Sequence, residues 1–202
     1  MPHTGTIDYH GENMKLLLAL CFTTTLPAQT WTPQTGNTRA SLRGVSAVDA
    51  GAVWASGSGG TYLATTDGGV SWRAAQVPGA ETLDFRGIRA IDARTVYLMS
   101  AGSGGLSRIY KTTDAGAHWT LLFTNPDPKG FFDAFAFWDA RHGIVVGDQV
   151  EGRAGIFTTG DGGQTWKLFD SGAYNAMSFV PGGDGWAVGP RGRIARFQPP
   201  AH

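Results

Sequence analysis

The sequence predicts an all-β protein: a β-propeller of about four four-stranded antiparallel blades. An eight-residue phrase of the form T-x-D-x-G-x-x-W occurs three times, and its aspartates, at positions 67, 114 and 161, are 47 residues apart. A fixed period in the forties is typical of propeller blades. Short β-branched and aromatic runs bounded by Gly and Asp fill each period, and no 3.6-residue periodicity favours helices after residue 28.

The phrase, called the repeated turn below, occupies residues 65–72, 112–119 and 159–166. Thr and Asp side chains bond nearby backbone N–H groups, Gly supplies a positive φ, and Trp offers a large apolar face to a neighbour. Each copy is therefore predicted to be a hairpin turn with an anchor, which is a structural role. The residues assigned to it are Thr65, Asp67, Gly69, Trp72, Thr112, Asp114, Gly116, Trp119, Thr159, Asp161, Gly163 and Trp166.

The remainder of each period predicts three further strands. An innermost strand closed by an aspartate turn is predicted at 42–49, 85–92 and 132–139, with a fourth copy at 174–180. A second strand holds Trp54, Tyr97, Ile144 or Trp186, and a third leads into each repeated turn. The blade repeats therefore span about 42–77, 85–124, 132–170 and 174–198 within a propeller domain of residues 29–202.

The last repeat lacks a repeated turn and an outer strand. Residues 29–35, with Trp31 followed by polar residues, are expected to supply that strand and close the ring, which would hide exposed sheet edges. Four blades is the lower limit for propellers. The sequence leaves open a closed ring, an open arc and half of a dimeric ring, and an open arc is expected to oligomerise.

Residues 1–28 are predicted to be an N-terminal extension followed by a secretory signal peptide. Met14 and Lys15 precede a short apolar run through Phe22, and Ala28 is a suitable small residue before a cut. The signal would be residues 14–28, and the sequence leaves open whether Met1 or Met14 is the start. The product is expected to be exported, periplasmic or extracellular, without cysteine and hence without disulfides.

Charge and composition exclude several classes of partner. Sixteen basic residues balance sixteen acidic ones, so the chain lacks the basic stripe that nucleic acid requires. No direct membrane span is expected. No closely spaced set of His, Cys or carboxylates predicts a metal site, and no phosphate-binding motif predicts a cofactor.

Four residues mark a predicted binding locus. Arg43, Arg86, Asp133 and Asn175 hold equivalent places at the start of the four inner strands, where a ring would bring them together near one mouth. An alternative is that these side chains bond loop backbone or pair with each other.

The T-x-D-x-G-x-x-W phrases resemble the Asp-box, or BNR repeat, of sialidases, some polysaccharide hydrolases and the photosystem II stability/assembly factor family. Together with the aspartate turns and the blade period, the chain is most similar to the assembly factors, as a shortened member. The resemblance implies an exported noncatalytic scaffold that binds a protein partner, such as a membrane-protein subunit on its extracytoplasmic side, through an arginine-bearing face. Arg43 and Arg86 are the residues of this sequence that the resemblance assigns to that face. The sequence leaves open whether the host is photosynthetic.

The alternative is an exported carbohydrate-active enzyme, a glycoside hydrolase or sialidase-like protein, on the same fold. A sialidase site needs an arginine cluster and a tyrosine with a glutamate base, but after residue 28 the only glutamates are Glu81 and Glu151, both in predicted loops. A carboxylate pair of Asp133 and Asp148 stays open. No residue is assigned as catalytic.

Overall fold

The computed structural model describes residues 29–148, 150–151, 155–170, 173–180 and 183–198. The chain divides into two units, residues 1–33 and 34–202. In the first unit the described residues, 29–33, belong to no helix or strand, and the expected signal at 14–28 lies outside the described residues. The second unit contains all the strands described below.

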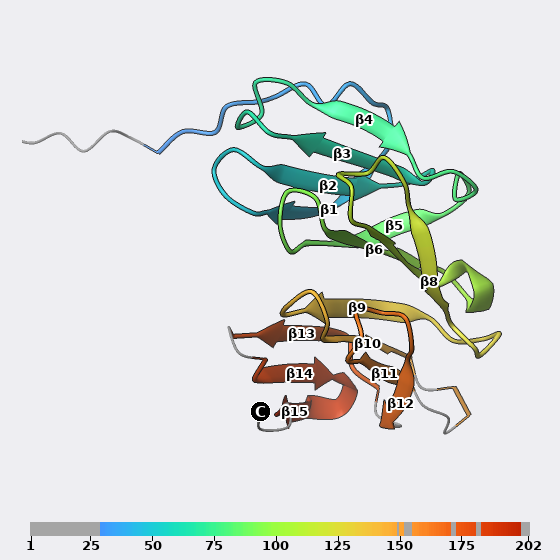
Figure 1. Cartoon of the computed structure of the whole chain (residues 1–202). Helices are drawn as coiled ribbons and strands as arrows, with labels where there is room; N and C mark the ends of the chain where they lie inside the picture. The colour runs from blue at the N-terminus through green and yellow to red at the C-terminus, as the bar shows by residue number, and fades with distance from the viewer. Residues whose placement is uncertain (1–28, 149, 152–154, 171–172, 181–182, 199–202) are drawn as a thin grey trace, which may run out of the picture. The chain divides into compact units, whose positions relative to one another are not determined.

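The strands form four antiparallel sheets in chain order (Figure 1). The first sheet is β1 (Leu42–Ala47), β2 (Val53–Gly57), β3 (Thr61–Thr65) and β4 (Arg73–Gln76). The second is β5 (Asp84–Ala90), β6 (Val96–Ala101), β7 (Arg108–Thr112) and β8 (Thr120–Thr124). The third is β9 (Phe132–Phe137), β10 (Gly143–Gly147), β11 (Ile156–Thr159) and β12 (Lys167–Asp170). The fourth has three strands, β13 (Ala176–Phe179), β14 (Gly185–Gly189) and β15 (Arg193–Phe197).

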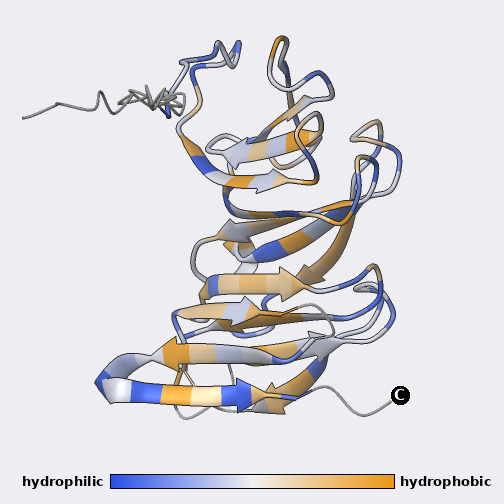
Figure 2. Cartoon of the chain, turned by 90° about the vertical axis from the view of Figure 1, so that its left-hand side faces the viewer, coloured by the Kyte–Doolittle hydropathy of each residue, from blue (hydrophilic) through white to orange (hydrophobic). Residues whose placement is uncertain are grey.

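The sheets stack face to face through their first strands. β1 contacts β5, β5 contacts β9, and β9 contacts β13. The first and fourth sheets lie at opposite ends of the series in both views (Figures 1 and 2). Apolar side chains of neighbouring sheets bury one another between the layers, as in the cluster that joins Trp54 and Tyr62 of the first sheet to Phe85 and Leu98 of the second.

Aspartate turns join the first two strands of three sheets, as the sequence predicts. The Asp49 carboxylate accepts hydrogen bonds of 2.7 Å from the N–H groups of Gly51 and Ala52. Asp92 and Asp139 accept the same pair of bonds in the second and third sheets. Such a turn closes a hairpin without help from distant residues, which explains its recurrence in the sequence.

The repeated turns link the third and fourth strands of the first three sheets. In the first copy Thr65 Oγ1 donates to Asp67 Oδ1 at 2.7 Å and accepts from Gly69 N at 3.0 Å. Asp67 then accepts bonds from the Ser71 hydroxyl, at 2.6 Å, and from the Ser71 N–H. Gly69 has φ of +86°, a conformation that glycine adopts without a steric penalty.

Each later repeated turn also packs on the sheet before it. The Tyr62 hydroxyl, on the first sheet, donates to the Gly116 carbonyl of the second turn at 2.7 Å. Trp119 packs edge-on against Tyr62, with 5.1 Å between ring centroids. In the same way Tyr97 and Lys111 of the second sheet both donate at 3.3 Å to the Gly162 carbonyl of the third turn. The turns therefore fix the position of one sheet on the next.

The expected closure by residues 29–35 is not found in this structure. The fourth sheet has three strands, and residues 29–41 form none. Gln34 is instead held on the first sheet: its Nε2 donates to the Gly68 carbonyl at 3.3 Å, and its Oε1 accepts from Trp72 Nε1 at 2.9 Å. Asn37 Nδ2 donates to the Trp72 carbonyl at 3.2 Å. These bonds hold Gln34 and Asn37 at the end of the series opposite β15.

Candidate functional site

Two arginines predicted from the sequence meet at one aspartate. Asp84, the first residue of β5, accepts a 3.2 Å bond from Arg43 Nε of β1 and a 3.0 Å bond from Arg86 Nε of its own strand. The arginine side chains are 45% and 52% exposed, whereas that of Asp84 is 24% exposed. One carboxylate therefore holds two half-exposed guanidinium groups side by side on adjacent inner strands.

The cluster has terminal N–H groups to spare. Each arginine bonds Asp84 through Nε, and no hydrogen bond from their Nη atoms to a described residue is present. The Arg86 guanidinium also lies 5.8 Å from the centre of the Phe131 ring. Because guanidinium N–H groups bond carboxylates in pairs, the arrangement can receive an anionic group of this geometry.

Asp133, the third predicted residue, is close enough to affect this charge. Its Oδ2 is buried without a hydrogen-bond partner among the described residues. Burial, followed by the negative charge of Asp148, raises the pKa of Asp133 to about 6, and the positive charge of Arg86 opposes the rise. The carboxyl group therefore gains or loses its proton near neutral pH.

Asn175, the fourth predicted residue, lies immediately before β13. Its backbone N–H donates to the Val188 carbonyl at 2.9 Å, and its side chain is exposed. The structure links Arg43 and Arg86 through Asp84 and brings Asp133 within electrostatic range of Arg86. No bond joins Asn175 to these three described residues.

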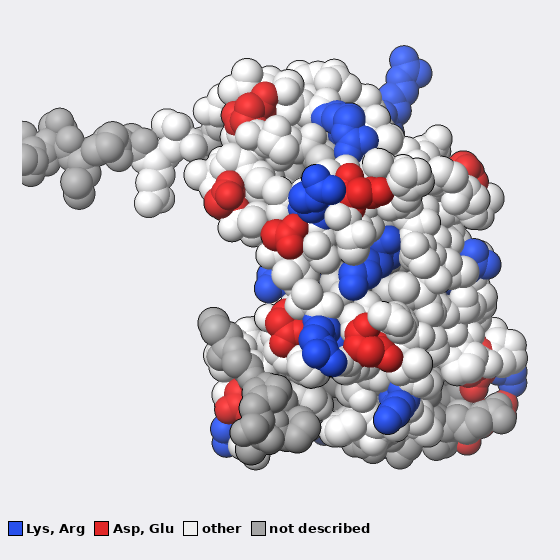
Figure 3. All heavy atoms as spheres, viewed as in Figure 1, with Lys and Arg blue, Asp and Glu red and all other residues white. Residues whose placement is uncertain are grey.

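Sequence reasoning did not identify Asp84 as the residue that joins the two arginines. Its signal was the short string Asp84-Phe85-Arg86, in which alternation along a strand puts Asp84 and Arg86 on one side. The bond from Arg43 joins two different sheets, so no pattern in the nearby sequence predicts it. On the side of the molecule drawn in Figure 3, basic and acidic residues are interspersed without a large area of one sign.

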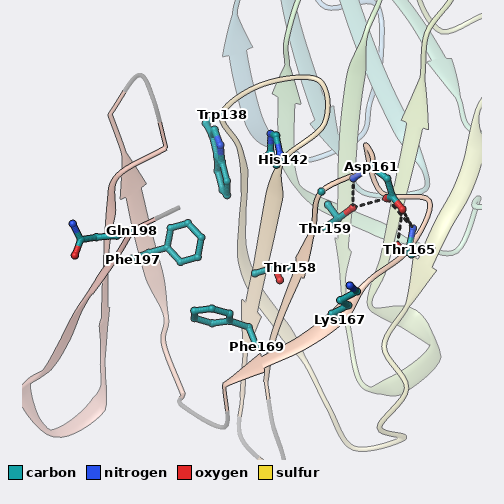
Figure 4. A pocket seen from close by; sticks show the side chains of 11 residues that line it. Trp138, His142, Thr158, Thr159, Asp161, Thr165, Lys167, Phe169, Phe197 and Gln198 are labelled. Carbon is teal, nitrogen blue, oxygen red and sulfur yellow. Dashed lines mark hydrogen bonds between the residues drawn. The ribbon is translucent and has the colours of Figure 1, made fainter. Parts of the chain in front are cut away.

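A second feature is a cavity of about 510 Å³ beside the third and fourth sheets. Figure 4 shows Trp138 and Phe169 of the third sheet facing Phe197 of β15 across this space, with Thr158 and Lys167 on its wall. Phe169 is 57% exposed, and its ring centre lies 5.5 Å from that of Phe197. The cavity combines these three aromatic rings with polar side chains such as Thr158 and Lys167, and sequence reasoning did not foresee it.

The aspartates of the repeated turns serve the fold. Hydrogen bonds from the Ser71 hydroxyl and N–H hold the pKa of Asp67 well below its usual range. Hydrogen bonds from the N–H and the ring of His118 lower the pKa of Asp114 in the same way. Hydrogen bonds from the hydroxyl and the N–H of Thr165 lower the pKa of Asp161. Each carboxylate is therefore ionised and committed to its own turn, as in Figure 4 for Asp161.

Within the described part of the chain, His, Cys, Asp and Glu form no group of three or more that could hold a metal ion. None of the described helices has the length and apolar character needed to cross a bilayer.

The fold is similar to those of solved propeller structures. "YCF48 bound to D1 peptide" superposes with a TM-score of 0.62 at 20% identity, over 88% of this chain and 58% of that one. "YCF48 from Cyanidioschyzon merolae" gives 0.59 at 20% identity, over 82% and 55%. The GH74 enzyme of Niastella koreensis gives 0.60 at 16% identity, over 77% and 28%.

These likenesses define the class of fold. The protein is an all-β protein with the fold of a β-propeller of about four blades. The chain spans a little more than half of the YCF48 chain. No protein-family model matches the sequence, and no protein of curated function is matched by it. At these identities the neighbours include both YCF48, in one structure bound to a D1 peptide, and GH74 enzymes.

Proposed function

We propose that this protein is an exported noncatalytic scaffold that binds a protein partner through the arginine cluster of Arg43, Asp84 and Arg86. The observation that carries the proposal is that one carboxylate holds two half-exposed guanidinium groups on neighbouring inner strands. The likeness to a YCF48 structure with a bound peptide supports it, because a protein of similar fold binds a polypeptide segment. The Asp-box resemblance and the apolar segment at 14–28 support export.

The geometry indicates which partner chemistry fits. Arg43 and Arg86 carry two positive charges against the one negative charge of Asp84, so these three side chains have net charge +1, to which nearby Asp133 adds a negative charge when it is ionised. A polypeptide carboxylate, from an acidic side chain or a chain end, would pair with the Nη atoms that face away from Asp84. We infer that the partner presents such a group on the extracytoplasmic side, for example from a membrane-protein subunit. Nothing in the cluster requires a photosynthetic host.

Affinity capture from the cell envelope of the host tests the proposal. Tagged wild type is compared with Arg43→Ala/Arg86→Ala and with the control Arg141→Ala/Arg191→Ala, which removes two exposed arginines elsewhere. The partner is expected to be recovered with wild type and the control, and lost with the first variant. Equal recovery by all three proteins would refute a role for the cluster.

A second function, glycoside hydrolysis, is favoured by a different observation. Asp133 carries a pKa raised to about 6 and lies within the electrostatic influence of Asp148, as an acid–base pair requires. GH74 enzymes are among the proteins of similar fold. Reducing-sugar release from plant β-glucans by purified protein, abolished by both Asp133→Asn and Asp148→Asn, would establish this function in place of the scaffold.

A further inference from the structure

The two ends of the sheet series expose surfaces that are buried everywhere else. Trp186, on the second strand of the fourth sheet, pairs with Ser178 of the first strand. By the same register, its equivalents in the other three sheets are Trp54, Tyr97 and Ile144. Those three are buried, whereas Trp186 is 43% exposed. The fourth sheet thus presents the face that normally receives a following sheet.

The same comparison holds on the third strand. By register, Ile194 of β15 is equivalent to residues that are at most 4% exposed, yet it is 69% exposed itself. Its buried equivalents are Tyr62, Ile109 and Ile156. At the other end of the series Val45 of β1 is 72% exposed, while its equivalent Ile88 is 9% exposed beside Gly44 of the preceding sheet. The first sheet thus presents the face that normally follows another.

The cavity lined by Trp138, Phe169 and Phe197 lies where the first junction holds the repeated turn of the next sheet. At the first junction, Thr65, Ser71 and Arg73 line a recess that also contacts Ala115 and Ala117 of the next repeated turn. The equivalent residues of the third sheet line the cavity, where no repeated turn follows. They are Thr159, Thr165 and Lys167. Beside the cavity, β15 has a partner strand, β14, on one side only.

Gln34 lies where the outer strand of a preceding sheet would lie. Leu122 of β8 lies against Gly163 of the next repeated turn, where an added Cβ would come within 2.5 Å of Leu122 Cδ1. Gln34 lies against Gly69 of the first repeated turn in the same manner. Leu122 is three residues after Trp119, and Gln34 is three residues after Trp31. Gln34 therefore occupies the place of an outer strand belonging to a sheet before β1.

We propose that two copies of this chain close one ring of eight sheets, in which residues 29–35 of each copy form the outer strand of the other copy's fourth sheet. Trp31, which is fully exposed in one copy, then fills the cavity beside Phe169 and Phe197 of its partner. The exposed face of Trp186 and Ile194 packs against the face of Val45. Eight blades are within the known range for propellers, and the added strand covers the free edge of β15 so that only short, protected edges remain.

The strand beside β15 comes from a second copy because residues 29–33 are too short to reach the fourth sheet of their own copy. Gln34 is fixed to the first sheet, and the five residues before it extend about 18 Å at most. Sheets stack at roughly 10 Å spacing, so the fourth sheet of the same copy lies about 30 Å away along the series. The first sheet of a partner copy, by contrast, would sit next to that fourth sheet and bring its own residues 29–33 alongside β15.

Cysteine pairing between two differently tagged copies tests this arrangement. In the other sheets the residue after the turn tryptophan pairs with the residue before the turn threonine, as Thr120 pairs with Lys111. Thr32 would therefore lie opposite Arg196. In a Cys21→Ser background, Thr32→Cys in one copy and Arg196→Cys in the other are expected to form a disulfide-linked pair that carries both tags. Ser178→Cys, on the innermost strand, replaces Arg196→Cys as the control and is expected to form none.

Absence of a mixed disulfide overturns the proposal, and so does an internal disulfide in a monomeric chain that carries both cysteines. Light scattering gives a second readout. Ile194→Asp is expected to weaken the dimer at least tenfold, because it puts a charge in the interface. Leu168→Asp, at an apolar position of similar exposure on the outer strand of the third sheet, is expected to leave the dimer unchanged. A wild-type monomer, or equal effects of the two variants, would equally refute the ring.

Discussion

Replacing Tyr62 by Phe tests the idea that repeated turns fix the position of neighbouring sheets. Tyr62 is 2% exposed, and its hydroxyl donates at 2.7 Å to the Gly116 carbonyl of the second sheet. Removing the hydroxyl loses this bond and leaves a buried carbonyl without it, at a cost of about 1 to 2 kcal/mol. The variant Tyr62→Ala also opens a cavity against Trp54 and Trp119, so its expected cost is about 3 to 5 kcal/mol.

The assay is urea unfolding followed by tryptophan fluorescence, with an unchanged slope showing that the folded and unfolded states keep their compactness. Tyr110→Phe is the matched control. Tyr110 is 5% exposed, but its hydroxyl receives only a 3.4 Å bond from Arg108 of the same strand. Its expected cost is below about 0.5 kcal/mol, since that bond is long and local. Equal losses for the two Tyr→Phe variants would refute the reasoning.

Three further predictions concern turns, pH and binding. Gly116→Ala should lower the free energy of unfolding more than Gly79→Ala does in the same assay, by about 1 kcal/mol or more. Both glycines have φ near +80°, but only at Gly116 would the added Cβ meet a buried ring, that of Tyr62. Burial raises the folded-state pKa of Asp133 from its ordinary value of 3.8 to about 6, so the contribution of this carboxyl group to the free energy of unfolding is most favourable below pH 4 and is lost as pH rises through 6. After allowance for solvent screening, this contribution is about 1 kcal/mol. Urea unfolding at pH 4 and pH 8 should therefore show that Asp133→Asn has a higher free energy of unfolding than wild type, by about that amount, only at pH 8. A difference between the two proteins that does not change with pH would contradict this prediction. Partner binding through Arg43 and Arg86 should weaken when salt is raised from 50 to 500 mM, measured by calorimetry with the captured partner, and salt-independent binding would argue against paired charges.

The sequence by itself determined the parts of the fold that depend on local chemistry. Asp49 closes its turn with bonds to residues two and three positions away, and Thr65 and Asp67 close theirs within four. Such bonds need no distant partner, so they recur with the repeat and reveal its period. Strand number and order in the first three sheets follow from that period.

Only the tertiary structure decided how distant repeats meet. Asp84 forms ion pairs with both Arg43 and Arg86, and the pair with Arg43 joins the first sheet to the second. The burial that raises the pKa of Asp133 depends on its surroundings in the folded chain. The same holds for Gln34, whose position on the first sheet set aside the expected pairing with the fourth. The physical reason is that hydrogen bonds within a turn are fixed by covalent connection, whereas packing between sheets depends on which faces remain to be buried.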